Sequence, residues 1–146
     1  MTILSWSLPT ATILNGLEVV ENLPLQWPIF GISACNPFDR ELSEGHNDQR
    51  TQRLALAIAK RATNHWIGHG KAFDDTYSEP TVFAEGLDYN TALGLGARFG
   101  QRAIFQVDAE TVSVIACRTG SSIRTWRRHW DNSAGPTIVT MHATSP

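Results

Sequence analysis

The chain from Asp88 to Cys117 reads DYNTALGLGARFGQRAIFQVDAETVSVIAC. Asp88 is a suitable helix N-cap, the apolar residues after it repeat on one helical face, and Gly100 can adopt the left-handed conformation that ends a helix. Beyond Gly100, β-branched and aromatic residues flank a short polar turn. This pattern predicts two antiparallel strands, over 103–107 and 111–117, so the stretch indicates a helix, a stop and a hairpin.

Two more elements are expected upstream of this stretch. The apolar run from Ile29 to Cys35 predicts a buried strand that stops at Asn36-Pro37, a common turn dipeptide. Ser43 can cap a helix that continues to about residue 62.

The helix that starts near Ser43 has a mixed face. Asn47 and Arg50 continue the stripe of Leu54 and Ile58, so they should lie at the margin of the core near the helix N-terminus. That end carries a partial positive charge and free N–H groups, which suit an anion.

Further short strands are expected around 65–68 and 81–84, with a hairpin-type Asn15-Gly16 near the N-terminus. We therefore predict an α+β fold in a single domain, with an antiparallel or mixed sheet of four to six strands and two main helices on one face. Residues 1–28 would form an N-terminal strand or hairpin extension and 29–117 the core. Residues 118–146 would be a basic Trp/Arg segment of the same domain.

Composition narrows the class of protein. The 146 residues are 42% hydrophobic and 18% charged with a formal net charge of -2, which argues against a general attraction to nucleic acid or to an anionic membrane. The sequence contains neither a long apolar span nor a signal-peptide pattern, so we expect a cytoplasmic protein without membrane contact. Cys35 and Cys117 lie in apolar contexts and are expected to be free, buried thiols.

Several short segments together carry a family resemblance. They are Ser33 to Pro37, Leu42-Ser43, Asn47 with Arg50, Glu79 before a strand, and Ala97 to Phe105, which contains Phe-Gly-Gln-Arg-Ala-Ile-Phe. In these segments the chain resembles the bacterial family known as domain of unknown function 3293 (DUF3293). It departs from the family pattern at His46 and Pro80, where an acidic residue and a serine are usual. The resemblance implies a small soluble bacterial protein and assigns no activity.

The polar residues at element ends suggest a ligand pocket. Our first hypothesis is that Arg50 and the helix N-terminus bind a small anionic ligand, such as a nucleotide or a phosphate, with Glu79 as a catalytic acid or base. Asn36, Asn47 and Gln101 would orient the ligand. The alternative is that these side chains only satisfy hydrogen bonds at the core margin, and whether the protein is an enzyme stays open.

The sequence predicts no metal site and no cofactor. His65 and His69 are four residues apart in a stretch that reads as a strand, where that spacing separates side chains by about 13 Å. Cys35 is a weak candidate nucleophile because a buried thiol has a raised pKa.

A second function hypothesis rests on the basic segment near the C-terminus. Arg124, Trp126, Arg127 and Trp130 interleave cations with large aromatic rings, as in surfaces that bind a nucleic acid or a protein. The protein would then be a non-enzymatic interaction module. The simpler alternative is that the tryptophans pack on the sheet and the arginines stay in water.

Overall fold

The computed structural model contains ten strands and two α-helices within the residues that it describes, which are 2–7, 13–14, 17–18, 26–72, 77–131 and 138–144. The strands are β1 Thr2–Ser7, β2 Ile13–Leu14, β3 Leu17–Glu18, β4 Ile29–Ile32, β5 Asn64–Ala72, β6 Ser78–Glu85, β7 Ala103–Val107, β8 Thr111–Ala116, β9 Ser122–Asp131 and β10 Ile138–Thr144. The helices are α1 Glu44–Ala59, α2 Tyr89–Arg98 and the 3-10 helix η1 Pro37–Asp39.

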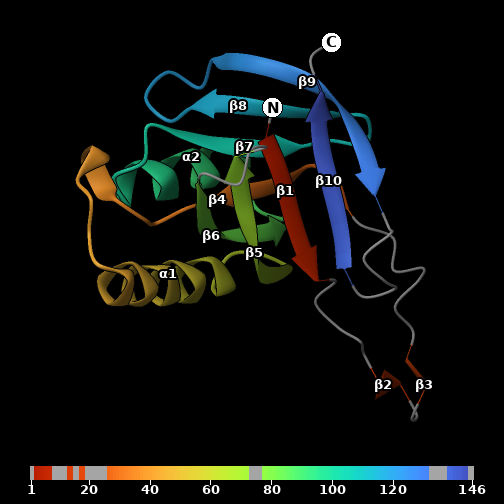
Figure 1. The fold of residues 1–146 in the computed structure, drawn as a ribbon, viewed down its shortest axis with the longest axis horizontal. Coiled ribbons are helices and arrows are strands. Elements are labelled where there is room, and N and C mark those ends of the chain that lie inside the picture. The colour runs from red at the N-terminus through yellow and green to blue at the C-terminus, as the bar shows by residue number, and fades with distance from the viewer. Residues whose placement is uncertain are drawn as a thin grey trace.

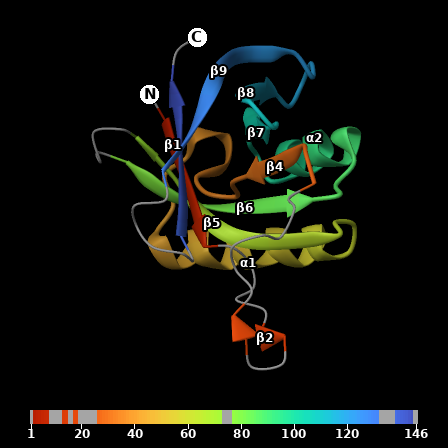
Figure 2. The ribbon, with the colours of Figure 1, turned by 90° about the vertical axis from the view of Figure 1, so that its right-hand side faces the viewer.

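Six strands form one antiparallel sheet in the order β5-β6-β4-β7-β8-β9, and β1 and β10 close it into a barrel (Figures 1 and 2). The predicted α+β single-domain fold is thus confirmed. β1 pairs with both β5 and β10, and β10 pairs with β9, so strands from both ends of the chain belong to the same barrel. The short strands β2 and β3, on either side of Asn15-Gly16, pair with each other as the hairpin signal predicts.

The strands alternate between two apolar layers. One layer fills the barrel interior with Leu4, Ile29, Trp66, Phe83, Val107, Val112 and Trp126. Gly31 on β4 lies opposite Phe83 on β6, and a Cβ at Gly31 would lie 2.9 Å from the Phe83 ring. Glycine is required there because the aromatic ring occupies the space of a side chain.

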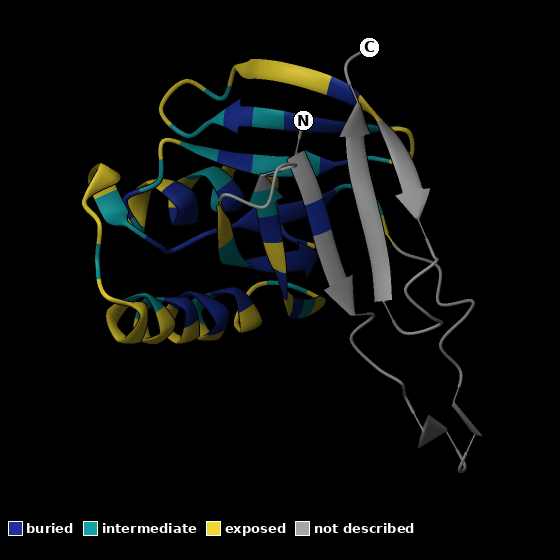
Figure 3. Ribbon diagram, viewed as in Figure 1, coloured by how far each residue is buried: buried dark blue, intermediate teal, exposed yellow. Residues whose placement is uncertain are grey.

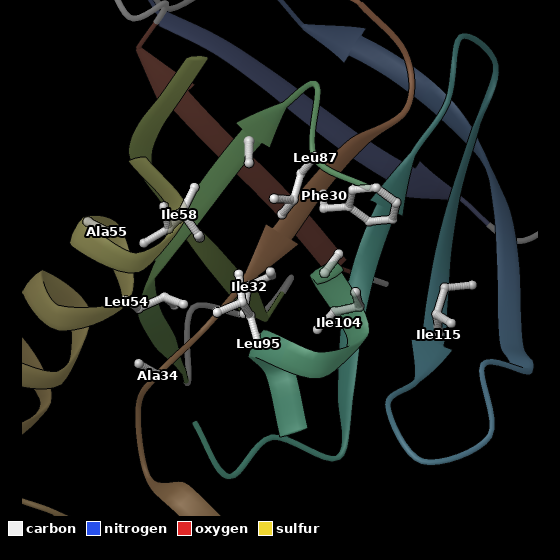
Figure 4. Close-up of a cluster of buried hydrophobic side chains, with 13 residues drawn as sticks. Phe30, Ile32, Ala34, Leu54, Ala55, Ile58, Leu87, Leu95, Ile104 and Ile115 are labelled. Atoms are coloured by element: carbon white, nitrogen blue, oxygen red, sulfur yellow. The ribbon is translucent and has the colours of Figure 1, made fainter. Parts of the chain in front are cut away.

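The second layer joins both helices to the outer face of the sheet, which confirms their placement on one face. Leu54 and Ile58 of α1 are fully buried against residues of β4 and β6, and Leu95 of α2 joins the same cluster (Figure 4). Burying a side chain of this size contributes roughly 1.5–3 kcal/mol. The opposite side of α1 is exposed, as expected of an amphipathic surface helix (Figure 3).

The predicted helix boundaries agree with the structure at their starts. Ser43 Oγ accepts a hydrogen bond from the backbone N–H of His46, and Asp88 Oδ2 accepts one from that of Thr91. α2 ends as predicted because Gly100 follows it with φ 75°. α1 ends at Ala59, slightly earlier than predicted, and the strand predicted from Ile29 ends at Ile32.

We predict that Gly100→Ala destabilises the fold whereas Gly94→Ala does not. A Cβ at Gly100 would lie 2.6 Å from the Cβ of Pro37, and its positive φ already disfavours a side chain, so the expected loss is about 1–3 kcal/mol. A Cβ at Gly94, inside α2, meets nothing within 4 Å and should add about 0.5–1 kcal/mol. Urea unfolding followed by circular dichroism measures both changes. Equal stability of the two variants would show that Gly100 is not constrained.

Candidate functional site

One rim of the barrel gathers the ends of three neighbouring strands. β4 ends there, and its antiparallel partners β6 and β7 both begin there. Cys35 and Asn36 follow β4, Glu79 lies at the start of β6, and Gln101 shortly precedes β7. The chain after Asn36 then leads to the N-terminus of α1, so four segments meet at this rim, as the sequence analysis expected.

Asn36 and Asn47 form a reciprocal pair that ties the end of β4 to α1. Asn36 has φ 47°, and its backbone N–H donates to Asn47 Oδ1 at 2.9 Å. In return, Asn47 Nδ2 donates to Asn36 Oδ1 at 3.0 Å, and the same oxygen accepts from the backbone N–H of Leu42 at 3.0 Å. Their hydrogen-bonding groups therefore fix the turn between β4 and the helix.

Arg50 and Gln101 join the segment after β4 to the end of α2 by donating hydrogen bonds to backbone carbonyls. Arg50 donates from Nε to Ala34 O and from Nη2 to Phe99 O, both at 2.6 Å, and its guanidinium lies 5.8 Å from the centre of the Phe99 ring. Gln101 Nε2 donates to Cys35 O at 2.9 Å and to Phe99 O at 3.2 Å. These contacts join the ends of β4 and α2 to the middle of α1.

Two adjoining cavities, of about 500 and 470 Å³, open at this rim. The residues that line both are Cys35, Asn36, Glu41, Tyr77 and Glu79, and we call the combined space the Glu79 pocket. Gln101 lines the first cavity and Asn47 the second. Arg50 lines neither, because it faces a separate groove between α1 and α2. The structure thus brings together four of the five predicted pocket residues.

Tyr77 belongs to the pocket and was missed in the sequence analysis. Its hydroxyl donates to Glu79 Oε2 at 2.5 Å. Burial raises the pKa of Tyr77, as do the hydrogen bond to Glu79 and the negative charge of that carboxylate, so the phenol keeps its proton. The two-residue spacing was a usable signal, since residues two apart share a strand face.

Cys35 contributes a protonated thiol to the pocket wall. It is buried, and burial raises its pKa, with a smaller contribution in the same direction from the charge of Glu79. A hydrogen bond with Ser33 works against this shift. A thiol in this state is a poor nucleophile, as the sequence analysis argued.

The Trp/Arg segment lies on β9, on another part of the barrel. Trp126 is 6% exposed and belongs to the barrel interior, with the Arg124 guanidinium 5.0 Å from the centre of its ring. Arg124 and Arg127 are exposed, and the Trp130 side chain lies outside what the structure describes. Within the described segment, Arg124 and Arg127 are exposed together with Ile123 and Thr125, and Trp126 is not.

The described residues contain neither a cluster of metal ligands nor a helix that could span a membrane. No group of three or more His, Cys, Asp or Glu side chains there is arranged to hold a metal ion. None of the helices described is long and apolar enough to cross a membrane.

We predict that Arg50→Met lowers the free energy of unfolding by about 2–4 kcal/mol, because it removes two charge-assisted hydrogen bonds and leaves two carbonyls without this donor. Arg53→Met is the matched control. Arg53 is exposed on the same helix, so its replacement should change stability by less than about 0.5 kcal/mol. Urea denaturation measures the free energy of unfolding of both variants. Similar losses of stability in Arg50→Met and Arg53→Met would refute a special role for Arg50.

The similarity of the chain to known proteins comes from a family model. Neither the curated proteins nor the solved structures include a match. A family model described as "Protein of unknown function (DUF3293)" matches residues 32–104, which is half of the chain and includes α1, α2, β6 and the residues that line both cavities of the Glu79 pocket. The chain therefore belongs to the DUF3293 family.

Proposed function

We propose that the protein binds a small polar ligand in the Glu79 pocket and that Glu79 exchanges a proton with it. The observation that supports this most is the Tyr77–Glu79 hydrogen bond in the wall of a cavity large enough for a small molecule. Both side chains lie at the start of β6, on the rim where β4 ends and β7 begins.

The two oxygens of the Glu79 carboxylate have different surroundings. Oε2 accepts a hydrogen bond from the Tyr77 hydroxyl, whereas Oε1 has no hydrogen bond to the described residues. Because the raised pKa of Tyr77 keeps the phenol neutral, Tyr77 orients the carboxylate without competing for a proton. Oε1 is then free to accept a proton from a ligand or from a bound water.

The charge of the lining favours a neutral or positively charged ligand. Asp39, Glu41 and Glu79 line the first cavity together with Arg102, and Arg102 forms an ion pair with Asp39. Glu44 and Asp48 add two further carboxylates to the second cavity. The anionic ligand expected from the sequence depended on Arg50, which points into the other groove. We therefore propose an amine or a hydroxyl-rich molecule as the ligand of this pocket.

The proposed setting is the bacterial cytoplasm. Cys35 and Cys117 are free thiols in the structure, and unpaired cysteines are usual in a reducing compartment. The bacterial origin is proposed from the family resemblance alone.

The interaction-module hypothesis has weaker support. Trp126 is buried within the barrel, and a ring in that position has no free face for a base or a partner side chain to stack on. The exposed Arg124 and Arg127 would then have to recognise a partner without the Trp126 ring.

We predict that Glu79→Gln weakens ligand binding about tenfold or more, because a charge-assisted contact is replaced by a weaker neutral one. Thermal-shift screening of the wild-type protein against a mixture of amines, polyols and other metabolites would identify the ligand, and titration calorimetry would compare the variants. Glu110→Gln removes a carboxylate from the β7–β8 turn and should bind like the wild type. Equal affinities of Glu79→Gln and Glu110→Gln for the ligand would contradict the proposal.

The state of Tyr77 is tested by its titration. The chain has two tyrosines, Tyr77 and Tyr89, so Tyr89→Phe leaves Tyr77 as the one phenol whose absorbance changes at high pH. We predict that it ionises above the ordinary pKa of 10.0. Adding Glu79→Gln should lower the pKa of Tyr77, because the negative charge of the carboxylate disappears and the amide oxygen is a weaker acceptor for the phenol proton. A Tyr77 pKa at the ordinary value in both variants would exclude the described pairing.

A further inference from the structure

We infer that the groove between α1 and α2 is a second binding site, separate from the Glu79 pocket, for a ligand that carries two or more phosphate groups. The groove has a volume of about 600 Å³. Five cationic side chains line it, namely Arg50, Arg53, Lys60, Arg61 and Arg98, and no carboxylate does so among the described residues.

The concentration of charge is unusual for this protein. The whole chain has twelve Lys and Arg residues and a net charge of -2, yet five of the twelve line one groove. Within the described part of the chain, none of these five lies within 4 Å of a carboxylate oxygen. Like charges held together in this way repel each other, and a bound polyanion would remove that repulsion.

Helix dipoles account for only part of this arrangement. Arg98 is in the last turn of α2 and Lys60 is the C-cap of α1, where a positive charge is favourable. Arg50 and Arg53 lie in the middle of α1, where the dipole gives no such advantage. The hydrogen bonds to Ala34 O and Phe99 O account for the position of Arg50, whereas the position of Arg53 is better explained by the groove that it shares with Arg98.

The length of the cationic row indicates more than one phosphate. From Arg50 to Lys60 the helix axis rises by about 15 Å, and Arg98 adds charge from α2. Thr91 also lines the groove, but its hydroxyl and its backbone N–H both donate to Asp88 Oδ2, so the cationic side chains alone supply the attraction for phosphate. Apolar side chains of Leu56 and Leu95 complete the lining and suit an organic group attached to the phosphates.

The arginines differ in how much they can contribute. Arg50 is anchored by Ala34 O and Phe99 O, so it provides a fixed charge at the base of the groove. Arg53, Lys60, Arg61 and Arg98 are exposed and free to reach the ligand. The guanidinium groups of Arg53, Arg61 and Arg98 can each bind phosphate through two parallel hydrogen bonds, and the Lys60 ammonium adds a point charge.

The test is titration calorimetry at low salt with inorganic triphosphate, ATP and a short single-stranded oligonucleotide as probes. We expect at least one probe to bind, with an affinity that falls as salt is added. Tighter binding of ATP than of triphosphate would identify a nucleotide as the source of the phosphates, and tighter binding of the oligonucleotide would identify a nucleic-acid strand.

The double variant Arg53→Gln with Arg98→Gln should weaken binding by roughly tenfold for each lost contact. Arg40→Gln with Arg118→Gln removes the same charge outside the groove and should bind like the wild type. Arg53→Lys with Arg98→Lys keeps the charge and should recover most of the affinity. Circular dichroism confirms that each variant is folded.

Two outcomes would overturn the inference: no binding of any probe by the wild-type protein at low salt, or an equal loss of affinity in the variant outside the groove. Glu79→Gln should bind the phosphate probes like the wild type. A failure here is thereby distinguished from a failure of the Glu79 pocket proposal.

Discussion

The placement of both sites depends on Arg50 and the two backbone carbonyls that it binds. Its guanidinium bridges Ala34, just after β4, and Phe99, just after α2, from a helix that is attached to the sheet by apolar contacts and, at its N-terminal end, by the Asn36–Asn47 hydrogen bonds. Apolar packing is non-directional, so it holds α1 against the sheet without fixing where its ends lie. The two hydrogen bonds of Arg50 are directional and fix the position of the helix, and Gln101 donates a further hydrogen bond to the same Phe99 carbonyl.

This junction also separates two spaces of opposite charge. The turn from Phe99 to Gln101 is a wall between the two, since Phe99 lines the cationic groove and Gly100 and Gln101 line the carboxylate-rich Glu79 pocket. A single pocket holding both Arg50 and Glu79 would have let the two side chains neutralise each other. Because they line separate cavities, a chain with a net charge of -2 presents one space rich in carboxylates and one rich in cations, and these are the two binding sites that we propose.

Local sequence signals predicted most of the elements, because caps, stops and turns act over a few residues. Ser43, Asp88 and Gly100 lie where their short-range chemistry placed them, and the Asn47–Arg50 stripe faces β4 as its periodicity required. The barrel closure was not predictable, since β1 and β10 pair across almost the full length of the chain. For the same reason the spacing of Arg50 and Glu79 gave no sign that a wall lies between them. The cationic row on α1 was visible in the sequence, but its partner Arg98 is supplied by tertiary structure.

Most of the polar residues predicted at element ends use their hydrogen-bonding groups within the protein. Both donor hydrogens of the Asn47 amide have partners, in Asn36 and in the Leu42 carbonyl, and Gln101 Nε2 is similarly occupied. A ligand could use these groups only by breaking internal hydrogen bonds, at a cost of about 1–3 kcal/mol for each group left unsatisfied. Glu79 Oε1 and the exposed cations of the groove carry no such cost. The residues that shape the rim therefore position the proposed site, and we expect ligands to contact the side chains that the fold leaves unsatisfied.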